Sequence, residues 1–416
     1  MNRIFKNIAI KGVAVAAVVA LSAGVFCGCG KDTKKKEEAT EKPAATDSAG
    51  ESSIEKSYFE YDLSYMSLGQ YKGIKITKDL TVSDNEIAQA YYDDLKSISS
   101  FNTKHESGKT VEADIYKKLT AMYEKSRAIK KNDLIYFDYA GYLGDEAFEG
   151  GTAKNQELLI GSGNFIPGFE DAVIGHTPGN EFSIDVTFPK DYHAADLAGK
   201  AVVFKITVHH IYPEISEESV ALLGEAYKLK FEKEAAQSSE EKVYKPSFTD
   251  KSSYEKYVVS VLKAKKEQSF NESKRNLVLN AIVENTKFTS YPQDIIDDYD
   301  EIVEKQAEQY GIEKDVFLSY FYGIGTEEQY TEFLQKQVSS ECVIIGIIQT
   351  EKFTVTEDEI TKSAEEIAKQ YGFTTVEELY KQVPKVSVEN NLLSNKALDF
   401  ITENAVITTI DETSKS

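Results

Sequence analysis

The fold is decided by two glycine-rich stretches, Ala147-Phe148-Glu149-Gly150-Gly151 and Gly161-Ser162-Gly163-Asn164-Phe165-Ile166-Pro167-Gly168-Phe169-Glu170. Across residues 136–212, glycines interrupt the aromatic and aliphatic residues, which do not recur every three or four positions as they would along a helix. Glycine allows tight turns and a close approach of the backbone. The pattern therefore predicts a small, bent sheet with an apolar hollow that fits one compact apolar group.

The segment around these stretches has the residue pattern of β-strands separated by turns. Strands are expected at 134–139, around Phe148, at 158–160, at 182–186 and at 201–211, and residues 167–174 are expected to form one short helix. A turn is expected at Gly144-Asp145, and another where Gly161 follows an apolar run. Five strands and one short helix within about 80 residues predict a compact α+β domain.

The rest of the folded chain has the period of helices. Ser83 and Glu86 form a capping-box pattern that opens a helix to about Ser97, after a short strand at 71–76 and before a second helix at 115–129. From 213 to 410 the chain is expected to be helical, with helices at 254–285, 292–311, 316–322, 327–352, 357–371, 376–381 and 386–404. No heptad is sustained long enough to predict a coiled coil.

The composition limits the kinds of partner. With 416 residues the chain is expected to hold two or three domains. Its formal net charge of −21 argues against nucleic acid, because binding to phosphates depends on Lys and Arg. His209 and His210 alternate along a strand and cannot easily share one metal ion, so both are expected to be structural. Gly161-Ser162-Gly163 lacks the lysine of a phosphate loop. No cofactor and no metal are expected.

The N-terminus carries the pattern of an export signal. Basic residues up to Lys11 precede an uncharged apolar run at 12–26, which is too short to favour a permanent membrane span. Gly28-Cys29 resembles the bacterial lipoprotein signal, in which a small residue precedes the cysteine that is cleaved and lipidated. Cys29 is therefore the predicted lipidation site, and an ordinary secretory signal is the alternative. Cys342 lies in an apolar run and is expected to be a small core residue.

A series of short motifs gives the sheet-rich segment a more specific interpretation. They are Tyr139-Ala140-Gly141, Phe148-Glu149-Gly150-Gly151, Ile160-Gly161-Ser162-Gly163, Phe165-Ile166-Pro167-Gly168-Phe169-Glu170, Gly175-His176, Phe188-Pro189, Tyr192-His193-Ala194 and Val203-Phe204. In this order and at this spacing they resemble an FKBP-type peptidyl-prolyl isomerase domain, most closely the version found inside trigger factor. No single motif would suffice.

The resemblance implies a proline pocket and a role for each of its residues. The pocket would be lined by Tyr139, Phe148, Phe165, Ile166, Phe169 and Phe204, with Phe169 as its floor. The Ile166 N–H would bind the carbonyl before the proline, and Tyr192 and His193 would form the rim. Glu149 occupies the position of a frequent acidic residue, whereas Gln156 stands where many simple members have an aromatic wall residue. Rotation about an X–Pro bond has a barrier of about 18–20 kcal/mol, and a dry pocket lowers it without a covalent step.

The resemblance to trigger factor extends beyond this domain. It includes Tyr71-Lys72-Gly73-Ile74, the capped helix at Ser83, and the helices after Ile215, with Ser290-Tyr291-Pro292 before one of them. The ribosome-docking N-terminal domain of that family has no counterpart here, so a ribosomal role is not expected. The predicted domains are a lipoprotein signal at 1–28, a disordered tether at 29–57, an arm segment packing with the C-terminal helices at 58–130, the isomerase domain at 131–213 and a helical chaperone domain at 214–416.

Together these features predict an FKBP-type bent antiparallel sheet inserted in a mainly helical, trigger-factor-like chaperone domain. The expected function is that of a foldase, lipid-anchored to the extracytoplasmic face of a bacterial membrane. It would bind unfolded or newly exported proline-containing polypeptides and isomerise their X–Pro bonds. One alternative is a holdase chaperone with a catalytically weak isomerase domain. Another is a solute-binding lipoprotein, which would need two similar α/β lobes, whereas the sequence predicts one sheet-rich domain.

Overall fold

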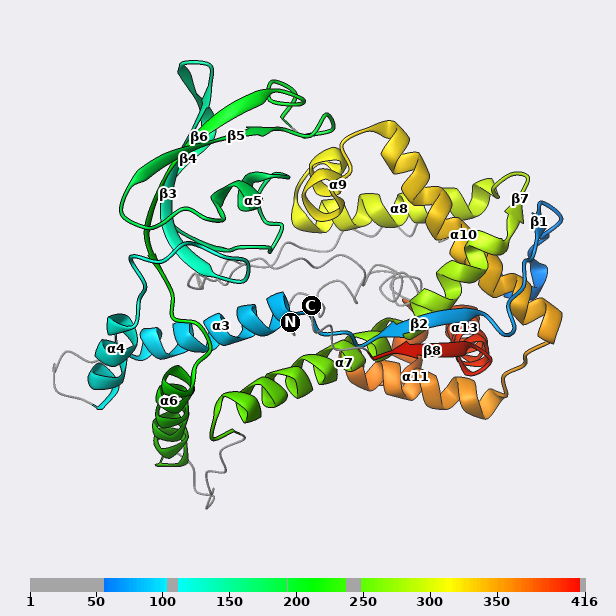
Figure 1. Cartoon of the computed structure of the whole chain (residues 1–416). Coiled ribbons are helices and arrows are strands. Elements are labelled where there is room, and N and C mark those ends of the chain that lie inside the picture. Colours follow the sequence, from blue (N-terminus) through cyan, green and yellow to red (C-terminus); the bar gives the residue numbers. More distant parts are fainter. Residues whose placement is uncertain (1–55, 103–110, 193, 237–247, 412–416) are drawn as a thin grey trace. The chain divides into compact units, whose positions relative to one another are not determined.

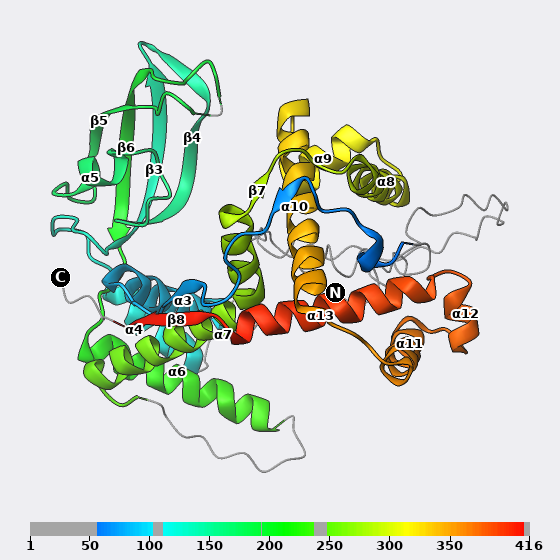
Figure 2. The same ribbon diagram turned by 90° about the vertical axis from the view of Figure 1, so that its right-hand side faces the viewer.

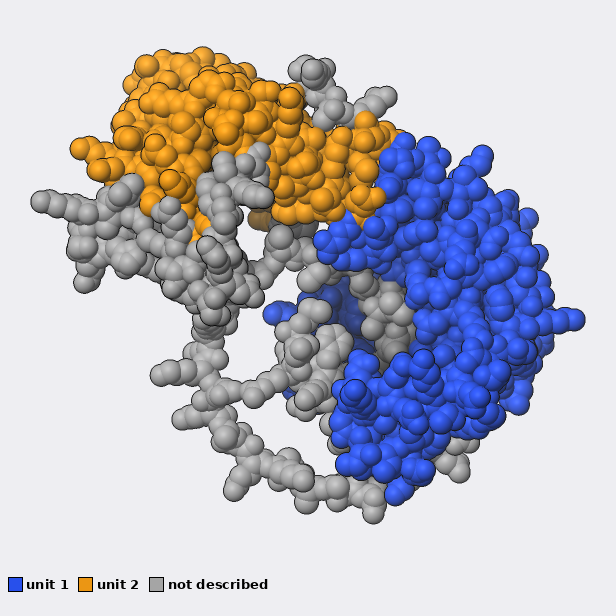
Figure 3. Space-filling model, turned by 90° about the horizontal axis from the view of Figure 1, so that it is seen from below, with its two compact units in different colours: residues 1–78, 268–409 blue, residues 79–267, 410–416 orange. Residues whose placement is uncertain are grey.

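The computed structural model describes residues 56–102, 111–192, 194–236 and 248–411, which fall into two compact units (Figure 3). Unit 1 comprises residues up to 78 together with 268–409, and unit 2 comprises 79–267 together with the residues from 410 onward. The predicted signal, Cys29, most of the tether and His193 lie outside the described residues. The predicted domain boundaries remain predictions.

A four-stranded antiparallel sheet forms the centre of the sheet-rich part of unit 2 (Figures 1 and 2). Its strands are β3 (Leu134–Leu143), β4 (Glu146–Leu159), β5 (Glu181–Thr187) and β6 (Ala201–Ile211), in the order β4-β3-β6-β5. The short helix α5 (Phe169–Val173) packs against the sheet and buries Phe169 and Val173 in the sheet's core. The predicted α+β fold class is confirmed.

The sheet has four strands where the sequence predicts five. The residues around Phe148 and those at 158 and 159 belong to one long strand, β4. Its pairing with β3 shifts register at two places, and within it Gly150 and Asn155 have positive φ angles of 74° and 56°. Bulges of this kind bend a strand without ending it. The residues that predict a break between two strands therefore produce a curve in one.

The helices of unit 2 form a second apolar core. They are α3 (Asp84–Asn102), α4 (Val111–Ala121), α6 (Glu217–Ala236) and the first part of α7 (Lys251–Asn285). Tyr91, Leu223 and Tyr254 are buried together in this core. The predicted capping box is confirmed, since Ser83 N–H donates to Glu86 Oε2 at 2.8 Å and Glu86 N–H donates to Ser83 Oγ at 3.2 Å.

One helical prediction in unit 2 needed correction. The helix expected at 115–129 ends at Ala121, because the following residues are drawn to the sheet: Glu124 forms a bridge with Ile211, and Ile129 is buried in the sheet's core. The bounds of α6 were not predicted, because its apolar residues do not fall on one clear face.

Unit 1 is mainly helical (Figure 1). Its helices are η1 (Tyr58–Glu60), the second part of α7, α8 (Gln293–Tyr310), α9 (Lys314–Tyr322), α10 (Glu327–Glu351), α11 (Glu357–Tyr371), α12 (Val376–Tyr380) and α13 (Lys385–Glu403). These bounds lie close to the predicted ones because the ends have clear local signals. Thr326 and Thr356 form capping boxes, and Gly311, Gly323 and Gly372 end helices in the left-handed conformation.

Two short strand pairs complete unit 1. β1 (Met66–Ser67) pairs with β7 (Lys287–Phe288), and β2 (Lys75–Asp79) pairs with β8 (Val406–Ile410). The strand predicted at 71–76 thus begins later, and the chain is not helical up to Ile410. The β-branched sequence Val406-Ile407-Thr408-Thr409-Ile410 explains the second correction, because such residues favour strands.

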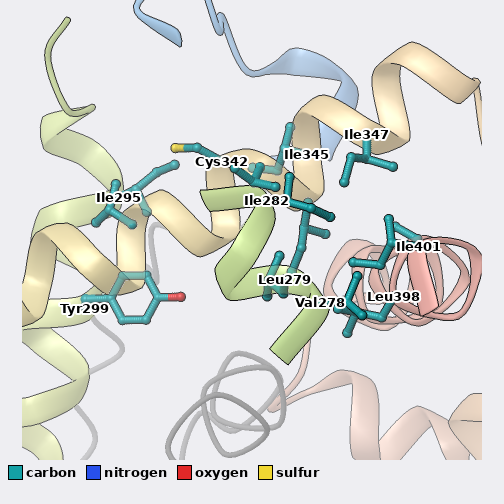
Figure 4. Packing of buried hydrophobic residues seen from close by; sticks show 14 of the residues in the cluster. Val278, Leu279, Ile282, Ile295, Tyr299, Cys342, Ile345, Ile347, Leu398 and Ile401 are labelled. Carbon is teal, nitrogen blue, oxygen red and sulfur yellow. The ribbon is translucent and has the colours of Figure 1, made fainter. Parts of the chain in front are cut away.

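The core of unit 1 is built around α10 (Figure 4). Cys342 and Ile345 of α10 lie there with Ile282 of α7, Tyr299 of α8 and Ile401 of α13. Cys342 is a buried free thiol, as predicted, and burial raises its pKa to about 12. At the start of the described chain, Gln349 Nε2 donates to Tyr58 O at 2.8 Å. Within the described ranges, no helix has both the length and the apolar character needed to cross a membrane.

Candidate active site

Five aromatic rings meet in the core of the sheet. They are Tyr139 from β3, Phe148 from β4, Phe165 from the loop before α5, Phe169 from α5 and Phe204 from β6. Phe204 lies edge-on to three of the other rings, with centroid distances of 6.0 Å to Tyr139, 5.8 Å to Phe148 and 5.2 Å to Phe169. Edge-to-face contacts are favourable for aromatic rings. The structure thus brings together the aromatic residues that the resemblance places in the pocket wall.

Two motif glycines make room for the Phe148 ring. A Cβ built on Gly141 would lie 2.4 Å from Phe148 Cζ, and one on Gly151 would lie 2.4 Å from Phe148 Cε2. Both distances are far below van der Waals contact, so a side chain at either position would displace the ring. At these two positions the absence of a side chain allows the Phe148 ring to lie close to the backbone.

The predicted floor of the pocket is fully covered. Phe169 is 0% exposed, and the Phe165 ring stacks on it with the centroids 4.3 Å apart and the planes 25° apart. Tyr139 lies edge-on to Phe165 at 5.4 Å. A ligand ring cannot touch Phe169 in this arrangement, because even a water molecule does not reach it.

The loop that carries Phe165 is held by the carboxylate of Glu170. Glu170 is 8% exposed and accepts from Gly161 N–H at 2.6 Å, from Ser162 Oγ at 3.1 Å and from Phe165 N–H at 3.4 Å. A buried carboxylate needs such donors to offset its desolvation. The sequence analysis gave Glu170 no role, although a glutamate directly after an apolar floor residue is the signal that could have found it.

The backbone at Ile166 has the donor that the resemblance assigns to it. Ile166 is half-buried against the core, and its carbonyl accepts from Phe169 N–H at 3.1 Å. Among the residues that the structure describes, the Ile166 N–H donates to no acceptor. It is therefore available to a carbonyl oxygen of a bound peptide.

The remaining predicted site residues lie nearer the surface. Tyr192 packs on Phe188 with the ring centroids 4.5 Å apart, and Phe188 in turn contacts Phe148. Glu149 is exposed on β4, as is Gln156, whose amide donates to Lys154 O at 2.8 Å. Their roles in binding stay predictions. Burial raises the pKa of Tyr139, so this phenol is protonated at neutral pH.

The two histidines of β6 make separate contacts away from the five rings. His209 Nε2 lies 3.2 Å from Asp138 Oδ1. His210 stacks on Tyr123 and Tyr136, with centroid distances of 4.4 and 5.1 Å, and burial lowers its pKa. Within the described ranges, no three His, Cys, Asp or Glu side chains are grouped so that they could hold a metal ion.

Two other surfaces could contact a polypeptide. In unit 2, a cleft of about 990 Å³ lies between α3 and the start of α7. Its lining is mixed: apolar residues such as Ile87, Ile215 and Val259 alternate with charged ones such as Lys130, Glu214, Lys251 and Glu255. In unit 1, the aromatic side chains of α8 and α9 form an exposed surface, which we call the α8–α9 surface. Tyr310 is 43% exposed, Tyr320 80% and Phe321 42%.

Comparisons with known proteins agree with this description. Residues 125–209 match the family model described as "FKBP-type peptidyl-prolyl cis-trans isomerase", and residues 253–403 match that of "Bacterial trigger factor protein (TF) C-terminus". The trigger factors of Bacillus thuringiensis (strain Al Hakam) and Bacillus anthracis (strain CDC 684 / NRRL 3495) are each 30% identical to this chain over 362 residues, which is 82% of this chain and 73% of the relative.

Among solved structures, the chain is similar to one described as "Promiscuous Substrate Recognition in Folding and Assembly Activities of the Trigger Factor Chaperone". It is 16% identical and covers 81% of this chain and 72% of its own, with a TM-score of 0.27. That superposition is poor, and the family is established by the sequence relatives. The chain belongs to the trigger factor family and carries an FKBP-type peptidyl-prolyl isomerase domain.

Proposed function

We propose that this chain is a foldase that binds unfolded polypeptides and catalyses cis–trans isomerisation of their X–Pro bonds. The observation that carries the proposal is the cluster of five aromatic rings next to the available N–H of Ile166. A compact apolar ring bound among the aromatic side chains is removed from water. The N–H can hold the carbonyl that precedes it.

The chemistry follows from the loss of amide conjugation during rotation. The planar amide is more charge-separated than the twisted transition state, so a pocket without water favours the twisted form. The Ile166 N–H donates to the carbonyl oxygen and keeps that side of the bond in place. Tyr192 closes the rim, and the aromatic rings fix the proline side while the bond turns. The barrier is lowered without a covalent intermediate.

The holding function is supported by the cleft of unit 2 and the α8–α9 surface. Large exposed apolar patches on soluble proteins are typical of interaction sites. The α8–α9 surface offers exposed aromatic side chains, and the cleft of unit 2 offers apolar contact next to charged side chains. Weak binding of a client on either surface raises the effective concentration of its prolines near the pocket. Even a slow isomerase then acts on a held client.

A second candidate function is that of a holdase with a feeble isomerase domain. It is favoured by the complete burial of Phe169 and by the exposed Gln156 at the place of an aromatic wall residue. Either feature weakens the binding of a proline ring.

Exchange NMR on a short X–Pro peptide distinguishes the two candidates. Catalytic amounts of the chain should accelerate cis–trans exchange, and Tyr192→Ala should slow that catalysis roughly tenfold or more, because the rim no longer positions the peptide. Tyr320→Ala is the matched control, since it makes the same change on the α8–α9 surface and should leave exchange unaltered. If the wild-type chain does not accelerate cis–trans exchange, the result favours the holdase function.

We also propose that the chain is a lipoprotein, anchored at Cys29 on the extracytoplasmic face of the membrane and serving newly exported clients. The support is the sequence pattern at Gly28-Cys29 after an apolar run. Cys29→Ala should release the protein from the membrane fraction, whereas Cys27→Ala should not. Membrane retention of Cys29→Ala would contradict the anchor, and a wild-type protein found only in the soluble fraction would favour an ordinary secretory signal.

A further inference from the structure

We propose that Phe165 is the lid of the prolyl pocket. Its ring occupies the space above Phe169 in the ligand-free chain and must leave before a proline ring can enter. This role rests on the proposed isomerase function. It names the residue that sets how readily a substrate reaches the pocket.

The position of the ring is the first observation. Phe165 stacks on Phe169 at 4.3 Å and contacts Tyr139 at 5.4 Å and Phe137 at 5.9 Å, so it covers Phe169. Phe169 is 0% exposed, whereas Phe165 itself is half-buried. Of the two stacked rings, Phe165 is therefore the one that is partly exposed to solvent.

The loop around Phe165 is built so that this ring can move while its base stays in place. Gly161, Gly163 and Gly168 all have positive φ angles, of 95°, 74° and 87°, which glycine adopts without strain. The base is fixed, since Gly161 N–H donates to Glu170 at 2.6 Å and Asn85 Nδ2 donates to Gly161 O at 2.8 Å. The bond from Phe165 N–H to Glu170 is much longer, at 3.4 Å, and therefore weaker.

The floor cannot open the pocket by its own movement. Phe169 lies on α5 and is held edge-on by Phe204 at 5.2 Å, inside a core in which neighbouring side chains are closely packed. Displacement of Phe165 needs no such rearrangement. The pocket therefore opens through the loop and not through the helix.

Only molecules with an open lid can bind substrate. The apparent affinity is therefore the affinity of the open form multiplied by the fraction of molecules that are open. One aromatic stacking contact changes such an equilibrium by roughly two- to tenfold. Phe165→Val should therefore lower KM for a short X–Pro peptide by about that factor. Loss of a group that stabilises the transition state would lower kcat instead.

A fluorescent floor residue reports the lid directly. The chain contains no tryptophan, so Phe169→Trp introduces one tryptophan under Phe165, which can be excited separately from the tyrosines. Acrylamide should quench it weakly in Phe169→Trp alone and several times more strongly when Phe165→Val is added. Phe182→Val is the matched control, because Phe182 stacks on His176 in the same core and does not cover Phe169. It should leave quenching as in Phe169→Trp alone.

The two readouts separate this role from the isomerase proposal. Increased quenching with Phe165→Val but not with Phe182→Val supports the lid even if no variant isomerises a peptide. Equal quenching with and without Phe165→Val overturns it, and so does an unchanged or raised KM in an active enzyme. Circular dichroism checks that each variant is folded. If Phe165→Val is not folded, Phe165→Leu can be used instead, because it also removes the stacked ring. The expected and the contradicting results are the same.

Discussion

The chain uses aromatic residues in two contrasting ways. In the pocket of unit 2, Phe169 and Phe204 are 0% and 5% exposed and pack against other rings. On the α8–α9 surface of unit 1, Tyr320 and Phe321 are 80% and 42% exposed. The first arrangement accepts one small group after a ring has moved. The second offers apolar contact at once to any extended segment. The proposed catalysis and the proposed holding are thus assigned to separate residues and should be separable by mutation.

The difference arises from the local elements. The pocket rings come from three strands, a loop and a helix, so they pack against one another from several sides. α9 has only nine residues, and its buried face is already occupied by Phe317, which is 3% exposed. Tyr320 and Phe321 follow on a short helix that cannot bury its whole circumference. Their exposure is a consequence of having more aromatic residues than one face can accommodate.

Phe169→Ala should have the largest effect, because it removes a buried ring of the pocket and should lower both the stability of the domain and its catalysis. Truncating a buried Phe leaves a cavity and typically costs about 3–5 kcal/mol of unfolding free energy. We expect that loss in the unfolding transition of the isomerase domain, together with loss of catalysis, measured by urea denaturation and peptide exchange. Suppression of client aggregation by the α8–α9 surface should persist. A variant that keeps wild-type catalysis would show that Phe169 is not part of the pocket.

Glu341→Gln should affect unit 1 alone, with a smaller effect that depends on pH. Burial raises the pKa of Glu341 above its usual 4.5, although it accepts from Tyr58 Oη at 3.3 Å and from Tyr299, and the nearby Asp294 and Asp298 raise it further. The ionised form is thus disfavoured in the folded chain, so stability decreases as pH rises above 4.5. The Gln variant should be more stable than wild type at pH 7, and the difference should shrink toward pH 4.5.

Glu351→Gln in the same helix is the control with the opposite sign. Hydrogen bonds from Lys72 and Tyr71 lower the pKa of Glu351. Its contribution is therefore present at neutral pH and lost as pH falls, and the Gln variant should be less stable than wild type at pH 7. Equal pH dependence of the two variants in thermal denaturation would contradict both assignments.

The double variant Tyr320→Ser/Phe321→Ser should change stability least. Substitutions of exposed side chains usually alter the unfolding free energy by less than about 0.5 kcal/mol. We expect weaker suppression of client aggregation, measured by light scattering, with unchanged exchange of a short X–Pro peptide. Leu277→Ser, at a residue that is 40% exposed outside the α8–α9 surface, is the control. If both variants suppress aggregation equally well, clients are held elsewhere.

Sequence reasoning reached the fold class and most helix ends because these depend on local signals. Pro292, Thr326 and Gly311 mark their helix termini directly. It divided β4 in two because a bulge and a turn share the same residues. It placed Phe165 and Phe169 in one pocket but not one on top of the other, since stacking depends on side-chain rotamers that spacing does not encode. The hydrogen bonds accepted by Glu170 were not predicted, because their donors are mostly backbone N–H groups, which every residue except proline has.

The central claim is most directly tested by the refolding of a client whose slow phase is limited by proline isomerisation, with light scattering recorded at the same time. The whole wild-type chain should accelerate the slow phase and reduce aggregation. Tyr192→Ala should reduce aggregation equally and lose most of the acceleration. Equal acceleration by both proteins, or a slow phase that the wild-type chain leaves unchanged, would contradict the assignment of isomerisation to this aromatic pocket.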